Sequence, residues 1–419
     1  MNRIKALAGA ITLALSATVA HAGEVEVLHY LTSSGEAAAI NVLKQELEKE
    51  GHTWKDFAVA GGGGETAMTV LKSRAVSGNP PAAAQIKGLD IQEWGEMGFL
   101  TNLDKVSSAG QWDTLLPPVV SNIMKYEDHY VAVPVNVHRV NWLWANPAVF
   151  KQAGVEVPTS WNDFFKAADA LKAKGIIPLA HGGQPWQDAT LFEAVALGVG
   201  GADFYRKAFV EHDAATLSGE TMVKVLETFK KTRDYIDADA PGRDWNIATS
   251  MVINGTAAMQ VMGDWAKGEF TAAGKKAGVD YVCLAAPDTA SAFTFNIDSF
   301  VMFDLFDQGS DSSVKAQADL ARLIMEPTFQ TAFNLNKGSI PVRQDIDRAP
   351  FDSCATSSMD AFKSSADSNT LVPSFAHGMA TTSRVQGAIF DVVTNFYNSK
   401  DQSAKAAADK LARAVKASL

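Results

Sequence analysis

The chain has 419 residues, of which 47% are hydrophobic and 20% are charged, the composition of an ordinary folded protein rather than a disordered or fibrous one. This length exceeds what a single hydrophobic core usually supports, so two domains are expected. With 47 acidic and 37 basic residues, the formal net charge is −10. No cluster of Lys and Arg offsets this charge, which argues against nucleic acid as a partner.

The first 22 residues have the three parts of a secretory signal peptide. Arg3 and Lys5 provide a positive start, residues 6–19 are apolar or small, and residues 20–22 (Ala-His-Ala) form a small-x-small cleavage motif. The apolar run is shorter than the about 20 residues that a membrane-spanning helix needs. We therefore predict export and cleavage after Ala22, with no stable membrane insertion afterwards. A short N-terminal anchor or a buried helix is the alternative.

Predicted strands and helices alternate in the chain that follows. Patterns of apolar residues predict strands at 24–31, 57–60 and 82–86, and helices at 36–50, 65–76 and 89–97. This alternation is typical of an α/β fold with a mostly parallel sheet covered by helices. Further along, strands are expected at 131–138, 282–285 and 295–303, and helices at 162–174, 189–197, 221–235 and 403–415.

Four consecutive glycines, Gly61 to Gly64, precede the predicted helix at 65–76. Amides at a helix N-terminus attract anions, but this turn lacks the Gly-Lys-Ser/Thr ending of a phosphate loop and the spacing of a dinucleotide fingerprint. We interpret it as a place where the backbone approaches a neutral ligand or a neighbouring helix closely.

Cysteine and histidine usage points away from metal chemistry. The histidines are scattered without zinc spacing, no Gly-x-Ser-x-Gly motif is present, and neither a catalytic centre, a metal site nor a cofactor is predicted. The two cysteines, Cys283 and Cys354, would meet an oxidising compartment after export, so we expect a disulfide between them. Two separate buried thiols are the alternative.

Three of the nine tryptophans stand in polar surroundings: Trp186 in QPWQD, Trp245 in RDWN and Trp265 in GDWA. An indole beside carboxylates and amides is suited to sugars, because its flat face stacks on ring C–H groups while the polar side chains bind hydroxyls. Any one of them could instead pack in the core.

Four motifs carry a resemblance over essentially the whole mature chain: LHYLTSSGEAAA, PTSWNDFFKAADAL, INGTAAMQVMGDWA and KGSIPVR. With these motifs the sequence resembles the family 1 extracellular solute-binding proteins, which are the carbohydrate receptors of ATP-driven (ABC) importers. Three further segments, AQIKG, FNIDSF and FAHGMA, are most similar to the periplasmic glucose-binding subgroup.

The resemblance implies a type II periplasmic-binding-protein fold, in which two hinged lobes hold the ligand between them. The N-terminal lobe would comprise residues 23–135 and 296–341, and the C-terminal lobe residues 136–295 and 342–419. It further implies a monomeric periplasmic protein without enzymatic activity. This protein would bind a monosaccharide, glucose or a close relative, and deliver it to a membrane permease.

Where this sequence matches the motifs of the family, the family's sugar-binding residues correspond to ten positions of this chain. Glu36, Lys87, Asp298, Lys337 and His377 would bind hydroxyls, Trp245 and Trp265 would supply aromatic walls, and Gln85 and Asn296 are weaker candidates. The tenth, Tyr30, marks a departure, because the subgroup commonly has two tryptophans where this chain has Tyr30 and Leu31. Leucine presents no π-face, so another monosaccharide or weaker glucose binding stays open.

Two other functions are compatible with these residues. A periplasmic glycoside hydrolase or lyase would need two carboxylates around a glycosidic bond, and Glu36 and Asp298 could serve. A chemoreceptor ligand carrier would use the same fold as a transport receptor.

Overall fold

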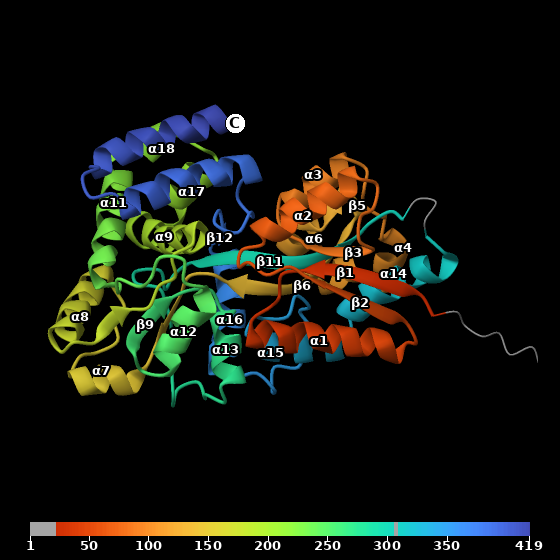
Figure 1. Cartoon of the computed structure of the whole chain (residues 1–419), viewed down its shortest axis with the longest axis horizontal. Helices are drawn as coiled ribbons and strands as arrows, with labels where there is room; N and C mark the ends of the chain where they lie inside the picture. Colours follow the sequence, from red (N-terminus) through yellow and green to blue (C-terminus); the bar gives the residue numbers. More distant parts are fainter. Residues whose placement is uncertain (1–21, 306–308) are drawn as a thin grey trace, which may run out of the picture.

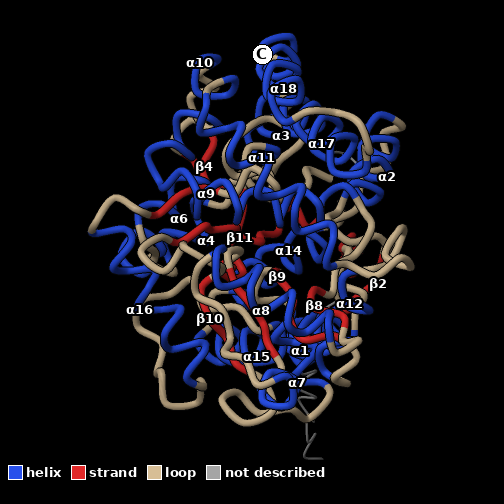
Figure 2. The backbone as a smooth tube through the Cα atoms, turned by 90° about the vertical axis from the view of Figure 1, so that its left-hand side faces the viewer, coloured by secondary structure: helices blue, strands red, loops and turns tan. Residues whose placement is uncertain are grey.

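Two hydrophobic cores organise the protein, which is described by a computed structural model over residues 22–305 and 309–419. In Figure 1 the two halves lie side by side, and β6 and β11 run through the middle between them. Figure 2, a view from the side, has strands in the interior and helices outside. The predicted signal peptide, residues 1–22, lies outside the described part of the chain except for Ala22, so it stays a prediction.

The first core is built on a six-stranded sheet with the order β12-β11-β3-β1-β2, in which β6 also pairs with β11. Its strands are β1 (Glu24–His29), β2 (Thr53–Ala58), β3 (Ala83–Ile86), β6 (Ala132–Arg139), β11 (Phe293–Met302) and β12 (Leu371–Pro373).

The expected parallel arrangement is confirmed for the first three strands, and the strands that join them make the sheet mixed. β1 is parallel to β2 and to β3, and β11 to β12, but β11 runs antiparallel to both β3 and β6. The physical reason is the connection. The first three strands are joined by crossover helices, which keep them parallel, whereas β11 enters the sheet from the other half of the molecule and no local crossover fixes its direction.

The second core contains a four-stranded sheet with the order β10-β7-β9-β8. Its strands are β7 (Trp142–Ala145), β8 (Ile177–Leu179), β9 (Ala257–Val261) and β10 (Val282–Ala285). β7 is antiparallel to β9 and β10, while β8 and β9 are parallel. A separate small hairpin pairs β4 (Lys125–Tyr126) with β5 (His129–Tyr130).

Eight helices described in the structure surround the first sheet: α1 (Ser34–Lys49), α2 (Glu65–Val76), α3 (Asp90–Glu96), α4 (Asp104–Ala109), α5 (Trp112–Leu115), α6 (Pro118–Ile123), α14 (Asp311–Ile324) and α15 (Pro327–Lys337). Helix α1 illustrates why they form. Ala39, Leu43 and Leu47 recur at helical spacing and are all fully buried, so this face packs on the core.

Most of the remaining helices pack on the second core: α7 (Pro147–Ala153), α8 (Trp161–Ala173), α9 (Pro185–Phe209), α10 (Ala214–Ser218), α11 (Glu220–Thr232), the 3₁₀ turn η1 (Arg233–Tyr235), α12 (Trp245–Ile253), α13 (Ala266–Ala272), α17 (Ser383–Asn398) and α18 (Ala404–Ser418). Helix α16 (Ser353–Asp367) packs on β11 and β12 of the first sheet and reaches the second core through Cys354. None of the helices described is both long and apolar enough to span a bilayer.

Most predicted elements are confirmed within a few residues, including the helix at 65–76 and the strand at 282–285 with their exact bounds. The predicted helix at 189–197 is the middle of α9, which begins at Pro185 and ends at Phe209. For the segment between β11 and α18 the sequence analysis predicts no element, and it forms α14 to α17 and β12.

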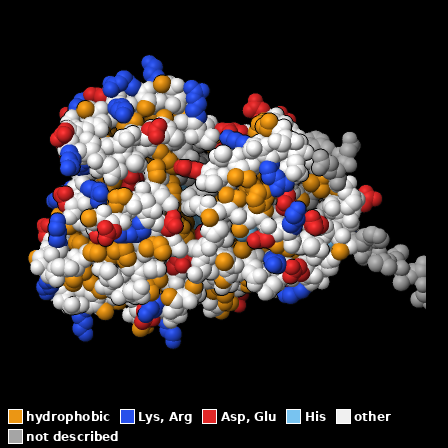
Figure 3. Space-filling view, in the orientation of Figure 1, with side chains coloured by type: hydrophobic (Ala, Val, Ile, Leu, Met, Phe, Trp, Pro, Cys, Tyr) orange, Lys and Arg blue, Asp and Glu red, His pale blue; other side chains and the backbone are white. Residues whose placement is uncertain are grey.

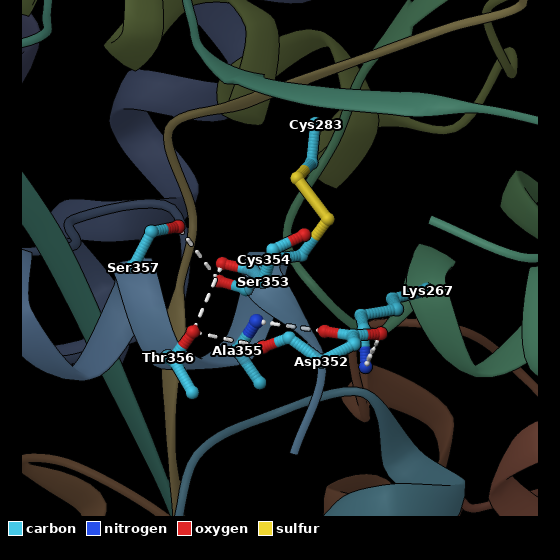
Figure 4. The surroundings of a disulfide bond; sticks show 8 residues. All are labelled: Lys267, Cys283, Asp352, Ser353, Cys354, Ala355, Thr356 and Ser357. Atoms are coloured by element: carbon cyan, nitrogen blue, oxygen red, sulfur yellow. Dashed lines mark hydrogen bonds and ion pairs between the residues drawn. A yellow bond between two sulfur atoms is a disulfide. The ribbon is translucent and has the colours of Figure 1, made fainter. Parts of the chain in front are cut away.

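The predicted disulfide between Cys283 and Cys354 is confirmed, and it joins β10 to the first turn of α16 (Figure 4). Asp352 caps the same helix by accepting a hydrogen bond from the N–H of Ala355 at 2.9 Å, and it forms an ion pair with Lys267 of α13 at 3.0 Å. The start of α16 is therefore fixed at once to the second sheet and to α13.

Candidate functional site

A cavity lies between the two cores, and nine of the ten predicted ligand residues line it: Tyr30, Glu36, Lys87, Trp245, Trp265, Asn296, Asp298, Lys337 and His377. The remaining lining residues are Gly62, Gly63, His138 and Trp186. In space-filling view the outline is notched between the half that carries α17 and α18 and the half that carries α2 and α3 (Figures 1 and 3).

The parts of the first core that reach the cavity are ends of strands and helices. Tyr30 follows β1, Lys87 follows β3, and Lys337 is the last residue of α15. Carboxyl ends of neighbouring parallel strands meet at one edge of a sheet, which is where ligands bind in open α/β folds. The chain therefore brings residues that are about 300 positions apart into one wall, as Glu36 and Lys337 demonstrate.

Glu36 has two structural partners in that wall. One carboxylate oxygen, Oε1, accepts from Lys337 Nζ at 2.5 Å, and the other, Oε2, accepts from the N–H groups of Thr32 and Ser33, each at 3.2 Å. It therefore caps the first turn of α1 and pairs with the end of α15 at the same time. The two side chains hold each other at the cavity wall in a fixed position.

Asp298, on β11, supplies a negative charge deep in the cavity. Burial alone would raise its pKa, but the nearby charge and hydrogen bond of His138, together with Lys337 and Lys87, hold the pKa well below its usual range. Burial lowers the pKa of Lys87, and the negative charge of Asp298 opposes that shift. Asp298 is therefore a permanently ionised acceptor beside two cationic donors.

The second core supplies rings to the opposite wall. The ring centroid of Trp265 lies 4.9 Å from that of His377 and 6.3 Å from that of Trp186. Burial, with Lys87 and His138 nearby, lowers the pKa of His377 well below its ordinary value, so its imidazole is neutral. Within the described part of the chain, Trp265 Nε1 is buried without a hydrogen-bond partner, which leaves a donor for an occupant of the cavity.

The glycine turn of the first core touches this aromatic wall. A Cβ added at Gly62 would lie 2.9 Å from Trp186 Cζ2, closer than side chains come in folded proteins, and 3.1 Å from Trp245 Cδ1, which is also a tight contact. Trp186 and Trp245 lie at the first turns of α9 and α12, in agreement with the interpretation that the backbone here approaches neighbouring helices.

Further contacts close the two halves on each other. The N–H of Gly35 in α1 donates to Glu269 Oε1 of α13 at 2.8 Å. The N–H of Leu89 donates to the carbonyl oxygen of Gly378 at 3.0 Å. The structure therefore has the two cores in a closed arrangement around the cavity.

Gln85 is the predicted residue that does not line this cavity. Its Oε1 accepts a hydrogen bond from the N–H of Tyr30 at 3.3 Å, so it supports the backbone of a lining residue. It faces an adjoining outer cavity, which shares Tyr30, Lys87 and Trp186 with the inner one and opens between α2 and α17. The buried Nε2 of Gln85 has no partner among the residues described.

Sequence reasoning missed two side chains of the cavity. Trp186 was recognised as a tryptophan in a sugar-binding context, and its QPWQD segment was the signal that could have placed it here. His138 lies in a strand-like run, VAVPVNVH, and nothing in that pattern distinguishes a cavity residue from a core residue. Among the described residues no group of His, Cys, Asp and Glu could hold a metal ion.

The comparisons with known proteins all point to the same class of protein. The family model described as bacterial extracellular solute-binding protein matches residues 32–298. A protein of Brucella melitensis named probable sugar-binding periplasmic protein is 47% identical over 97% of this chain and 96% of its own length. A Rhizobium meliloti protein of the same name is 45% identical over 98% of this chain and 99% of its own length.

A solved structure has the same fold. The bacterial solute receptor AcbH, described as having an exclusive preference for β-D-galactopyranose, superimposes with a TM-score of 0.79 at 17% identity, covering 94% of this chain and 99% of the receptor. The chain belongs to the bacterial extracellular solute-binding protein family, and it has the two-lobed fold of the sugar receptors in that family. The resemblance seen in the sequence motifs is thus confirmed.

Proposed function

We propose that this protein is the periplasmic sugar-binding component of an ABC importer and that it binds one monosaccharide in the cavity between its lobes. The observation that carries the proposal is the pairing of two unlike walls. Charged, fixed groups line one side, and indole rings line the other. A pyranose has this same division, with hydroxyl groups around its edge and C–H groups on its faces.

The ten residues predicted from the motifs are proposed as ligand residues with two changes. Trp186 and His138 join them, and Gln85 acts indirectly through the backbone of Tyr30. Hydrogen bonds to the ionised Asp298 and Lys337 would contribute about 1.5–3 kcal/mol each. Several such bonds with ring stacking support a dissociation constant of about 1 μM after the entropy costs of binding.

Capture would follow from closure of the lobes. We place the lobe boundaries as the sequence analysis expects, with residues 23–135 and 296–341 in one lobe and 136–295 and 342–419 in the other. The separation of the two cores supports this division. Only the closed arrangement offers both walls to one sugar, so ligand binding favours closure, and the closed form would dock on the membrane permease.

Hydrolysis is the weaker alternative. A general acid needs a carboxyl group with a raised pKa, whereas the pKa of Asp298 is depressed and Glu36 is ion-paired with Lys337. The names of the relatives also describe binding proteins. We therefore propose a protein without catalytic activity.

Calorimetric titration of the mature chain, Gly23 to Leu419, tests the function. D-glucose, D-galactose, D-mannose, D-xylose and maltose would be titrated in turn. We expect one monosaccharide to bind with 1:1 stoichiometry and a dissociation constant near 1 μM. Binding of maltose alone would contradict the monosaccharide proposal, and release of reducing sugar from oligosaccharides would contradict the absence of catalysis.

A further inference from the structure

His138, one of the residues that line the cavity, lies between two carboxylates. Its side chain is 1% exposed, and it reaches from β6 to Asp264, which follows β9, and to Asp298 of β11. Nδ1 is hydrogen-bonded to Asp264 Oδ1, and Nε2 lies 2.9 Å from Asp298 Oδ2. Asp264 is fixed in turn, because its Oδ2 accepts from the N–H of Arg139 at 2.9 Å.

A second group near Nε2, the side-chain amide of Asn136, helps to determine which nitrogens of His138 carry protons. Asn136 Nδ2, an amide donor, lies 3.0 Å from His138 Nε2. A neutral ring with an unprotonated Nε2 would accept from Asn136 and would face Asp298 Oδ2 lone pair to lone pair. A ring protonated on both nitrogens would donate to both carboxylates. Because Asp298 is ionised and buried, Nε2 must carry a proton, and the hydrogen bond from Nδ1 to Asp264, whose Oδ2 accepts from the N–H of Arg139, places the second proton on Nδ1.

The charges around the ring agree with this arrangement. Burial by itself lowers the pKa of His138, but Asp264 and Asp298 outweigh it and raise the pKa. Arg139, the next residue of β6, is the cationic neighbour on the same strand. From other elements, Lys337 of α15 and Lys87 after β3 bring positive charge, and the neutral His377 lies nearby in the loop after β12.

The same cluster ties together segments that connect the lobes. Asn136 Oδ1 accepts from the N–H of Asp298 at 3.2 Å, and its Nδ2 donates to Ser339 Oγ at 3.0 Å. Next to them, the backbones of Val137 and Ile340 exchange hydrogen bonds at 2.8 and 3.0 Å. His138 therefore acts where β6, β11 and the segment after α15 meet.

We propose that His138 is a positioning residue for ligand binding: as an imidazolium anchored on Asp264, it holds Asp298 Oδ2 and leaves Oδ1 directed at the ligand. This inference rests on the proposed function. Across the part of the chain that the structure describes, Asp298 Oδ1 has no hydrogen-bond partner, so it is available as an acceptor for a hydroxyl group. Loss of the proton from His138 frees Asp298 to turn and removes the fixed acceptor.

Two substitutions separate positioning from mere packing. In His138→Asn the amide replaces Nδ1–H and keeps a donor for Asp264, but no donor reaches Asp298. In His138→Gln the amide extends to the position of Nε2–H and keeps the donor to Asp298. His52→Gln is the matched control, because His52 is also buried and lies 2.9 Å from a carboxylate, Asp319, away from the cavity.

Sugar affinity is measured by calorimetry with the monosaccharide that binds the wild-type chain most tightly, between pH 6 and pH 9.5. We expect about 10- to 100-fold weaker binding for His138→Asn, since a charge-assisted bond is lost, and recovery to within about fivefold for His138→Gln. Wild-type affinity should fall as the pH rises above the pKa of His138, whereas His138→Gln should keep a flatter profile. Any slope left in that variant comes from other groups near the cavity, such as Lys87 and Glu193. Equal affinities and equal pH profiles in all four proteins would overturn the proposal.

A ligand-free measurement keeps this test independent of the sugar. Imidazole ¹⁵N chemical shifts of the wild-type protein, assigned with the His138 variants, should report both ring nitrogens protonated at pH 7. Asp298→Asn should convert the ring to a neutral form with Nε2 unprotonated. A neutral His138 in the wild type at pH 7 would refute the inference even if a sugar binds. If the ring is doubly protonated at pH 7 but none of the tested monosaccharides binds in calorimetry, the proposed monosaccharide ligand is contradicted instead.

Discussion

The two walls of the cavity are built on different principles. On the first-core side, the charged groups are already paired within the protein, as Glu36 is with Lys337 and Asp298 with His138. On the second-core side, Trp186, Trp265 and His377 contact one another as rings, and the donor of Trp265 is unused in the described structure.

Because they are built differently, the two walls contribute differently to ligand binding. Buried charges are costly to remove from water, and the ion pairs offset that cost before any ligand arrives. The charged wall is therefore rigid and selects the direction of hydroxyl groups. The aromatic wall contributes apolar area, and it depends on how the second core holds its loops and helix ends.

Removing the disulfide should produce the largest effect, and it should act on stability rather than on sugar binding. Cys283 and Cys354 are 71 positions apart, so a Cys283→Ser/Cys354→Ser variant should lose about 4 kcal/mol of unfolding free energy on chain-entropy grounds. Urea denaturation would measure this loss. Sugar affinity should stay within about twofold of the wild-type value. A large loss of affinity in the folded variant would show that the disulfide also positions the site.

Glu193 should give the aromatic wall a pH dependence. This residue of α9 is 1% exposed, and its carboxylate accepts from Ser374 Oγ at 2.7 Å and from the N–H of Ala376 at 3.3 Å, next to His377. Burial raises its pKa to about 7, although hydrogen bonds from Ser374 and Tyr205 oppose the shift. The folded state thus holds this proton over a pH range in which the unfolded chain has lost it.

The stability of the wild type should therefore fall by roughly 1.4 kcal/mol per pH unit between about pH 4.5 and pH 7 on account of Glu193. The contribution is fully present below the unfolded pKa and is lost as the pH rises through the folded value. In Glu193→Gln this slope should disappear, which thermal or urea unfolding at several pH values would reveal. An unchanged slope would mean that Glu193 is ionised throughout.

Lys337→Met tests the charged wall. The substitution leaves the Glu36 carboxylate without its cation and removes a donor from the cavity, so we expect about 10- to 100-fold weaker sugar binding by calorimetry. Lys267→Met is the matched control. Lys267 is also 3% exposed and ion-paired, with Asp352 at 3.0 Å, but it does not line the cavity. Equal losses in both variants would point to a general effect of buried lysines.

Trp265→Ala tests the aromatic wall and should have the smallest effect of the four, about tenfold weaker binding with an intact fold. Trp265→Phe should recover most of this loss, because a smaller ring still covers the sugar face although it lacks the indole donor. If Trp265→Phe binds as weakly as Trp265→Ala, the unused Nε1–H rather than the ring face carries the contribution of this residue.

Local patterns made much of the fold predictable. Helical spacing predicts α1 and alternation predicts β1, because these signals depend on neighbours within a few residues. The direction of β11 was not predictable in the same way. It is fixed by pairing with β3 and β6, which belong to distant parts of the chain.

In the candidate site, too, some residues were predictable from local sequence patterns and others were not. Motifs placed Asp298, Lys337 and Trp265 at the cavity, and a polar tryptophan context indicated Trp186. Gln85 does not line the inner cavity, because its side chain accepts a hydrogen bond from the backbone of Tyr30 and faces the outer cavity, so its contact with a ligand stays a prediction.

The family, the cysteine pair and most residues of the two walls were predictable without a structure, since motifs and residue types carry that information directly. Tertiary structure alone decided that Glu36 is paired with Lys337 and that His138 bridges Asp264 and Asp298. The physical reason is distance along the chain. These partners are separated by more than 120 residues, and a hydrogen bond between them exists only once the lobes, and the strands that join them, are in place.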